Sequence, residues 1–156
     1  MLEIIEQATT SADLDVFRAM CREYAAELGI DLEMQNLTQE LAELPGKYAP
    51  PAGALLLARV DGQVAGCVAL KKLSEGIGEM KRLFIRPAYR KIGLGRRLVE
   101  RIVGETRGLG YGVLRLDTLP GKRGRAVALY RSIGFVSIPA YWNSTLPGTE
   151  YMEMKL

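Results

Sequence analysis

Two glycines set among basic residues are the first feature of this sequence whose spacing could do chemistry. Gly93 and Gly95 fall where a loop is expected to become a helix, and residues 81–97 hold seven Lys or Arg and no Asp or Glu. Glycine lets a bound group come close to the backbone, and the N–H groups at the start of a helix attract anions. This pattern predicts a cradle for phosphate groups.

Two common nucleotide motifs can be compared with this spacing. A Walker A loop needs Ser or Thr after Gly-Lys, whereas Gly121-Lys122 is followed by Arg123, so that motif is excluded. A Rossmann fingerprint needs a third glycine where Leu98 stands and places its glycines directly after the strand. Asp117, at the end of the next expected strand, stands where a Rossmann fingerprint has the acidic residue that binds the ribose. The dinucleotide alternative is therefore weakened but stays open.

A third motif fits better. The run Arg90-Lys-Ile-Gly-Leu-Gly95 resembles the Arg/Gln-x-x-Gly-x-Gly/Ala signature of the GNAT superfamily of acetyltransferases. The run Ala126-Val-Ala-Leu-Tyr-Arg-Ser-Ile-Gly-Phe135 resembles the Ala-x-x-x-Tyr-x-x-x-Gly-Phe pattern of the family's following helix and strand. The matching core covers residues 79–135, with the two motifs in the family's order.

This resemblance implies an enzyme that moves the acetyl group of acetyl-CoA onto an amine, which attacks the thioester directly. Backbone groups at Leu83, Phe84 and Ile85 would pair with the pantetheine arm, and the amides from Ile92 to Arg96 would hold the pyrophosphate. Arg123 stands where the family often has Asn, so an arginine would serve the phosphates there. The cofactor residues that the resemblance implies are Leu83, Phe84, Ile85, Arg90, Lys91, Ile92, Gly93, Leu94, Gly95, Arg96 and Arg123.

The resemblance also implies two catalytic residues. Tyr130 would protonate the departing coenzyme A thiolate, since a phenol one hydrogen bond from the sulfur can act as a general acid. Glu79 is the candidate base for an ammonium acceptor, directly or through water. The simpler alternatives are a core aromatic for Tyr130 and an ordinary salt bridge for Glu79. Tyr141, Trp142 and Tyr151 either wall an acceptor pocket or cover the core.

Composition excludes several other classes of protein. The chain has no His, which removes Ser-His-Asp and Cys-His nucleophiles, and two Cys do not supply the usual zinc ligands. We therefore expect no metal. Cys21 and Cys67 lie in apolar segments and are expected to be free thiols in a reducing, cytoplasmic setting. No stretch has the length of a membrane span and nothing resembles a leader, so no membrane partner is expected.

The elements that must position these residues follow from periodicity and turn signals. The 156 residues suit one domain spanning 1–156. Thr10 and Asp13 resemble a capping box, and Asp61-Gly62 is a strong hairpin signal. The element order predicts an α/β (α+β) fold with a mixed, mostly antiparallel twisted sheet and about four helices. Strands are expected at 2–7, 54–60, 63–71, 79–86, 113–119, 135–138 and 151–156, and helices after Thr10, at 37–44, from Leu94, and around 126–133.

Charge is unevenly distributed along the chain. Residues 1–50 hold ten Asp or Glu against three Lys or Arg, and the remainder holds eight against eighteen. An acidic part favours a cationic small-molecule or peptide amine as acceptor, with Glu23, Glu27, Asp31 and Glu33 as examples. The alternative is a non-enzymatic module whose basic surface binds nucleic acid, but no nucleic-acid-binding signature accompanies the charge, so no such partner is expected. The last strands either complete the sheet alone or pair in a homodimer.

Overall fold

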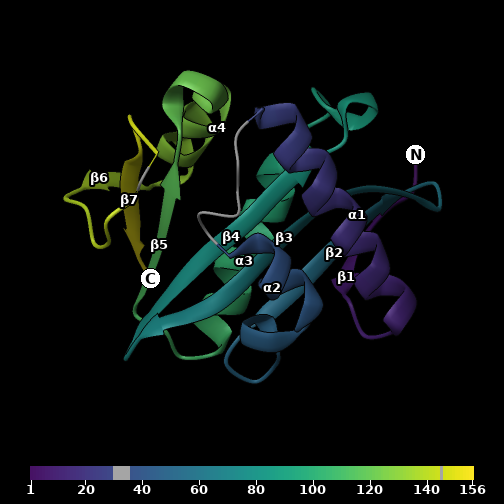
Figure 1. The fold of residues 1–156 in the computed structure, drawn as a ribbon, viewed down its shortest axis with the longest axis horizontal. Helices are drawn as coiled ribbons and strands as arrows, with labels where there is room; N and C mark the ends of the chain where they lie inside the picture. The colour runs from purple at the N-terminus through teal and green to yellow at the C-terminus, as the bar shows by residue number, and fades with distance from the viewer. Residues whose placement is uncertain (30–35, 145) are drawn as a thin grey trace.

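The computed structural model describes residues 1–29, 36–144 and 146–156, with the side chains of residues 120–123 outside the description. Seven strands form a single sheet in the order β1-β2-β3-β4-β5-β7-β6 (Figure 1). The elements are β1 (Glu3–Gln7), α1 (Ser11–Leu28), α2 (Leu37–Ala42), η2 (Gly46–Tyr48), β2 (Ala54–Val60), β3 (Gln63–Ser74), β4 (Ile77–Ile85), η3 (Pro87–Tyr89), α3 (Leu94–Gly108), β5 (Val113–Thr118), α4 (Pro120–Ile133), β6 (Val136–Ile138) and β7 (Glu150–Lys155).

Helices cover both faces of the sheet. The helices α1 and α2 lie on one face and α3 on the other (Figure 1). Each face has its own core, because alternate residues of a strand point to opposite sides. Phe17, Leu41 and Phe84 belong to the core beneath α1 and α2, whereas Leu98 and Tyr130 belong to the core beneath α3 and α4.

All strand pairs are antiparallel except β4 and β5, which run parallel. Their ladder covers only three residue pairs, from Ile77–Val113 to Glu79–Arg115. Beyond these pairs the two strands diverge (Figure 1). The sheet therefore opens in its middle, between two strands whose ends point the same way.

A bulge bends β4 beside this opening. Lys81 pairs with Ala69 and Phe84 with Cys67, so two residues of β4 stand opposite the single Val68 of β3. The first of the two, Arg82, has a left-handed backbone with φ = +60°. An extra residue of this kind increases the local twist and re-aims the side chains that follow.

The expected elements are present, with small differences at their ends. The capping box of α1 forms between Thr10 and Asp13, and Gly29 ends that helix with φ = +63°. The strands expected at 63–71 and 79–86 extend further toward each other, because Ser74 already pairs with Ile77. Gly76, with φ = +75°, lets a much tighter turn join β3 to β4. Among the described residues, no helix has the combined length and apolar character needed to cross a membrane.

Candidate active site

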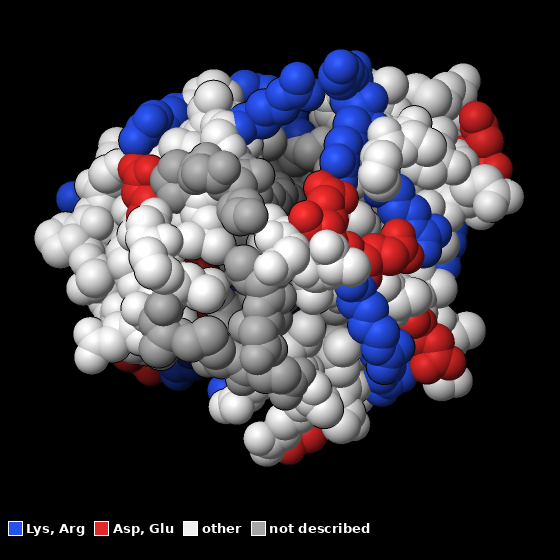
Figure 2. All heavy atoms as spheres, turned by 45° about the horizontal axis from the view of Figure 1, so that its top comes forward, with Lys and Arg blue, Asp and Glu red and all other residues white. Residues whose placement is uncertain are grey.

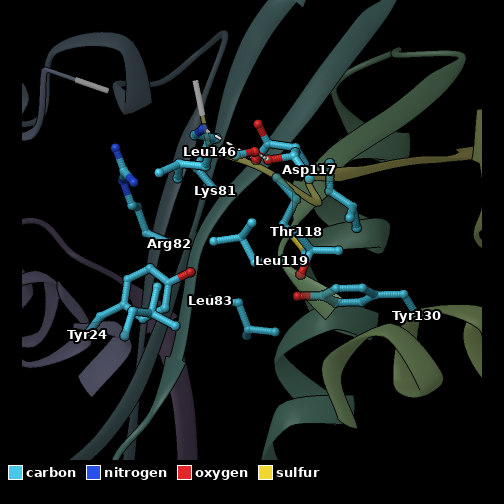
Figure 3. Close-up of a pocket in the computed structure, with 13 residues that line it drawn as sticks. Tyr24, Lys81, Arg82, Leu83, Asp117, Thr118, Leu119, Tyr130 and Leu146 are labelled. Carbon is cyan, nitrogen blue, oxygen red and sulfur yellow. Dashed lines mark hydrogen bonds and ion pairs between the residues drawn. The ribbon is translucent and has the colours of Figure 1, made fainter. Parts of the chain in front are cut away.

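The opening between β4 and β5 forms a cleft with side chains from four parts of the chain. Helix α1 contributes two residues, the diverging strands most of the rest, α4 one tyrosine, and the loop before β7 two more. Figure 3 shows the lining residues as they face the cleft. They are Tyr24, Leu28, Met80, Lys81, Arg82, Leu83, Leu116, Asp117, Thr118, Leu119, Tyr130, Leu146 and Thr149.

Tyr130, the general acid that the second motif implies, lies in this cleft. Its ring is 3% exposed and packs edge-on against Phe135 with 5.8 Å between the ring centres. Its hydroxyl points into the cleft opposite the hydroxyl of Tyr24, with Leu83 between them (Figure 3). Tyr130 is thus both a core aromatic and a cleft residue, and the two interpretations of its sequence position are compatible.

The loop before α3 has the backbone shape of an anion site. Gly93 caps the helix with φ = +81°, and no side chain caps this end. The first helical hydrogen bond runs from the Arg97 N–H to the Gly93 carbonyl oxygen at 3.2 Å. The amides of Leu94, Gly95 and Arg96 precede that bond and form the open N-terminal turn. We call residues 90–96 the phosphate cradle.

Most of the basic side chains of residues 81–97 are already paired with acidic residues of the N-terminal part. Figure 2 shows Lys and Arg on the rim of a hollow, with Asp and Glu directly beside them. Four arginines bind carboxylates of residues 3–40 with N–O distances of 2.5–2.9 Å. These pairs are Arg82–Glu40, Arg86–Glu23, Arg90–Glu27 and Arg97–Glu3.

Acidic residues of the N-terminal part and basic residues later in the chain therefore form ion pairs within the fold, which accounts for their separation along the sequence. Arg90 was expected beside the pyrophosphate, but its guanidinium binds Glu27, donates to the Ile85 carbonyl oxygen at 2.9 Å, and lies over the Phe84 ring. Among the described residues of the cradle, Lys91 and Arg96 make no ion pair, although Arg96 donates to the Ser132 hydroxyl at 2.5 Å. Backbone amides and these two side chains are left for an anion. These ion pairs neutralise most of the basic residues that suggested a nucleic-acid-binding surface.

Glu79 is buried beside the cleft, next to Met80 in β4. Its side chain is 3% exposed, and the Tyr141 hydroxyl donates a hydrogen bond to Oε2 at 2.6 Å. Lys71 Nζ lies 3.4 Å from Oε1. Burial, with the charge of Glu79 as a further cause, raises the pKa of Tyr141, so this phenol stays protonated and keeps donating.

A second carboxylate, Asp117, lies in the cleft itself. The indole N–H of Trp142 donates to Oδ2 at 2.7 Å, and Lys81 Nζ lies 3.9 Å from Oδ1. The side chains of Lys81 and Asp117 are 12% and 11% exposed. Tyr151 holds the loop in place by donating to the Trp142 carbonyl oxygen at 2.9 Å. The aromatic residues near the C-terminus thus bind the carboxylates beside the cleft.

The remaining expected cofactor residues fall into three groups. Leu83 lines the cleft, while Phe84 and Ile85 follow it on β4, with Phe84 buried beneath α1. Lys91 and Ile92 are exposed in the cradle. Arg123 lies within α4, but its side chain is outside the described residues, as are Asp31 and Glu33 entirely.

Sequence reasoning missed the contributions of Tyr24, Lys81 and Arg82 to the cleft. Tyr24 has the spacing of an apolar residue along α1, which by itself indicates a core position. Lys81 and Arg82 stand out in the sequence only as part of a basic run. The bulge at Arg82, whose side chain binds Glu40 of α2, has no glycine or proline to mark it, so no local signal predicts it.

The sequence matches a known protein family over most of its length. A sequence model of the acetyltransferase (GNAT) family matches residues 17–135. An uncharacterized N-acetyltransferase of Schizosaccharomyces pombe is 41% identical over 146 residues, covering 92% of this chain and 89% of that protein.

Solved structures share the fold. A GNAT-family acetyltransferase from Staphylococcus aureus Mu50 aligns over 99% of both chains with a TM-score of 0.82 and 17% identity. The PaiA N-acetyltransferase of Thermoplasma acidophilum, solved in complex with coenzyme A, aligns over 100% of both chains with a TM-score of 0.77 and 20% identity. At these identities the likeness concerns the fold.

Proposed function

The chain belongs to the acetyltransferase (GNAT) family, and we propose that its amine acceptor is acetylated in the cleft between β4 and β5, with Tyr130 as acid and Glu79 as base. It is an acetyl-CoA-dependent N-acetyltransferase. The mixed sheet with helices on both faces is the fold that the sequence motifs predicted.

The described residues fit the two ends of acetyl-CoA. The ladder between β4 and β5 ends at Glu79, so an extended pantetheine arm can lie along the following residues, Leu83 to Ile85, like an added strand. At the other end, Gly93 has a left-handed backbone with φ = +81°, which favours glycine at this position of the cradle. Its helix N-terminus suits a pyrophosphate. When bound, acetyl-CoA supplies the activated acetyl group.

Glu79 and Tyr130 carry out the two proton transfers of the reaction. An acceptor ammonium loses a proton to Glu79, through water because the carboxylate is buried beside the cleft. The neutral nitrogen then bonds to the acetyl carbon as the carbon–sulfur bond breaks. The Tyr130 phenol donates its proton to the departing thiolate, and the proton released from the nitrogen restores the phenol through solvent.

The observation that carries this proposal is that Tyr130 of α4 lines the same cleft as Leu83 of β4, the strand that leads into the cradle. Acetyl-CoA should raise the melting temperature, whereas NAD should not. No shift at millimolar acetyl-CoA would remove the proposed cofactor site, and a shift with NAD alone would favour the dinucleotide alternative.

Turnover can be followed by the release of free thiol from acetyl-CoA over a panel of amines. The chain's own thiols leave a low background, because Cys21 and Cys67 are both buried. Burial raises the pKa of Cys21 to about 12, so that thiol stays protonated and unreactive at assay pH. The cytoplasmic location and a homodimer stay predictions from the sequence alone.

A further inference from the structure

The cleft contains a partly buried cation, Lys81, to which no described residue forms a hydrogen bond. Lys81 is 12% exposed and lines the same cleft as Tyr130. Within the described part of the chain, its ammonium makes no hydrogen bond, and the nearest carboxylate oxygen, Asp117 Oδ1, is 3.9 Å away. An ammonium that is partly removed from water gains stability when an anion or further acceptors meet it.

Its ion pair is also looser than the others around the cleft. The arginines of β4 and the cradle hold their carboxylates at 2.5–2.9 Å, in hydrogen-bonded pairs. Asp117 is positioned by Trp142, whose indole N–H donates to its other oxygen at 2.7 Å. The Lys81–Asp117 pair therefore presents a positive and a negative group side by side on the wall of the cleft.

Two of the four acidic residues that suggested a cationic acceptor, Glu23 and Glu27, are occupied elsewhere. Glu23 and Glu27 of α1 bind Arg86 and Arg90 through hydrogen-bonded pairs. These carboxylates are neutralised before any acceptor arrives. Polyamines or aminoglycosides need several negative groups, and the described lining of the cleft offers only Asp117 against Lys81 and Arg82.

We propose that the acceptor is a free amino acid, whose carboxylate binds Lys81 while its amine lies toward Asp117 and the reacting centre. The hydroxyl groups of Thr118 and Thr149 line the same cleft and supply further neutral hydrogen-bonding partners. This inference rests on the proposed function of the cleft and adds a substrate class to it. Lys81 is then a specificity-determining residue, and a peptide N-terminus, which has no free carboxylate beside its amine, would be a poor acceptor.

The test compares matched acceptors. Thiol release and binding to the enzyme–coenzyme A complex are measured for the standard amino acids, for their carboxamides and for the corresponding decarboxylated amines. We expect the preferred amino acid to exceed its carboxamide by about tenfold to a hundredfold in kcat/KM, the value of a charge-assisted hydrogen bond. Lys81→Gln should raise the KM for the amino acid by a similar factor, leave its kcat nearly unchanged, and leave the carboxamide unaffected.

Controls separate this result from a general defect. Lys81→Met provides a second variant without the charge, and melting temperature reports whether each variant is folded. Lys72→Gln removes an exposed lysine of β3 that pairs only with Glu75 and should change nothing. Turnover of carboxamides or simple amines at rates equal to or above those of amino acids would overturn the amino-acid assignment while leaving the acetyltransferase site intact. Failure of every acceptor, together with no acetyl-CoA-induced shift in melting temperature, would overturn both.

Discussion

The phenol of Tyr141 donates a 2.6 Å hydrogen bond to the carboxylate of Glu79 across the gap between the β6–β7 loop and β4. Lys71 lies on the other side of that carboxylate at 3.4 Å. Glu79 therefore has the partners of a structural ion pair and the position expected of a base at the start of the diverging strand. Kinetics can separate these roles.

Glu79→Gln should lower kcat/KM about tenfold to a hundredfold near neutral pH, where the acceptor is an ammonium ion that needs a base. The loss should shrink at alkaline pH, because the free amine then reacts without deprotonation. The measurement is a pH profile of thiol release for both proteins. Glu105→Gln, which removes an exposed carboxylate from α3, is the control. An equal loss at every pH would indicate a structural role only.

Tyr130→Phe should lower kcat by about a hundredfold, the lower end of general acid catalysis, while the KM for acetyl-CoA changes little. The ring stays in place against Phe135, so the variant should fold. Tyr24→Phe is the matched control, since this second phenol faces the same cleft from α1 (Figure 3). If Tyr24→Phe alone reduced turnover, the acid role would pass to α1.

The cradle can be tested through its glycine. Gly93→Ala puts a side chain at a left-handed position with φ = +81°, which should cost about 1–2 kcal/mol of stability and weaken acetyl-CoA binding. Gly104→Ala in the same helix meets nothing within 4 Å and should instead stabilise by about 0.5–1 kcal/mol. Urea unfolding and acetyl-CoA titration report the two effects. Unchanged cofactor affinity in Gly93→Ala would contradict the assignment of the cradle.

The sequence predicted the parts of the fold that local chemistry determines. Thr10 with Asp13 begins α1, Asp61-Gly62 forms the hairpin, and the glycine-rich loop begins α3 because short-range sterics and hydrogen bonds decide these features. The sequence did not predict which charged residues would form ion pairs with each other. The pairing of Arg90 with Glu27 depends on how α1 lies across the sheet, and the pairing of Arg82 with Glu40 forms at a bulge in β4. Both are tertiary properties that no local spacing encodes.

The last prediction concerns the capping box of α1. The Thr9 N–H donates to Asp13 Oδ2 at 3.0 Å, and this bond, with further donors from Thr10 and Arg59, lowers the pKa of Asp13 in the folded protein. A lowered pKa means that Asp13 contributes stability in full above its unfolded pKa of 3.8 and loses it as pH falls through the folded value.

Asp13→Asn should therefore cost about 1 kcal/mol at pH 7, and the difference from the unaltered protein should shrink as pH falls below 3.8 toward the folded pKa. Urea unfolding at pH 7 and at low pH measures it. Asp15→Asn is the control on the same helix, because its side chain is 75% exposed and its pair with Arg18 contributes little. A cost for Asp13→Asn that stayed constant with pH would mean that packing, and not the carboxylate charge, holds the start of α1.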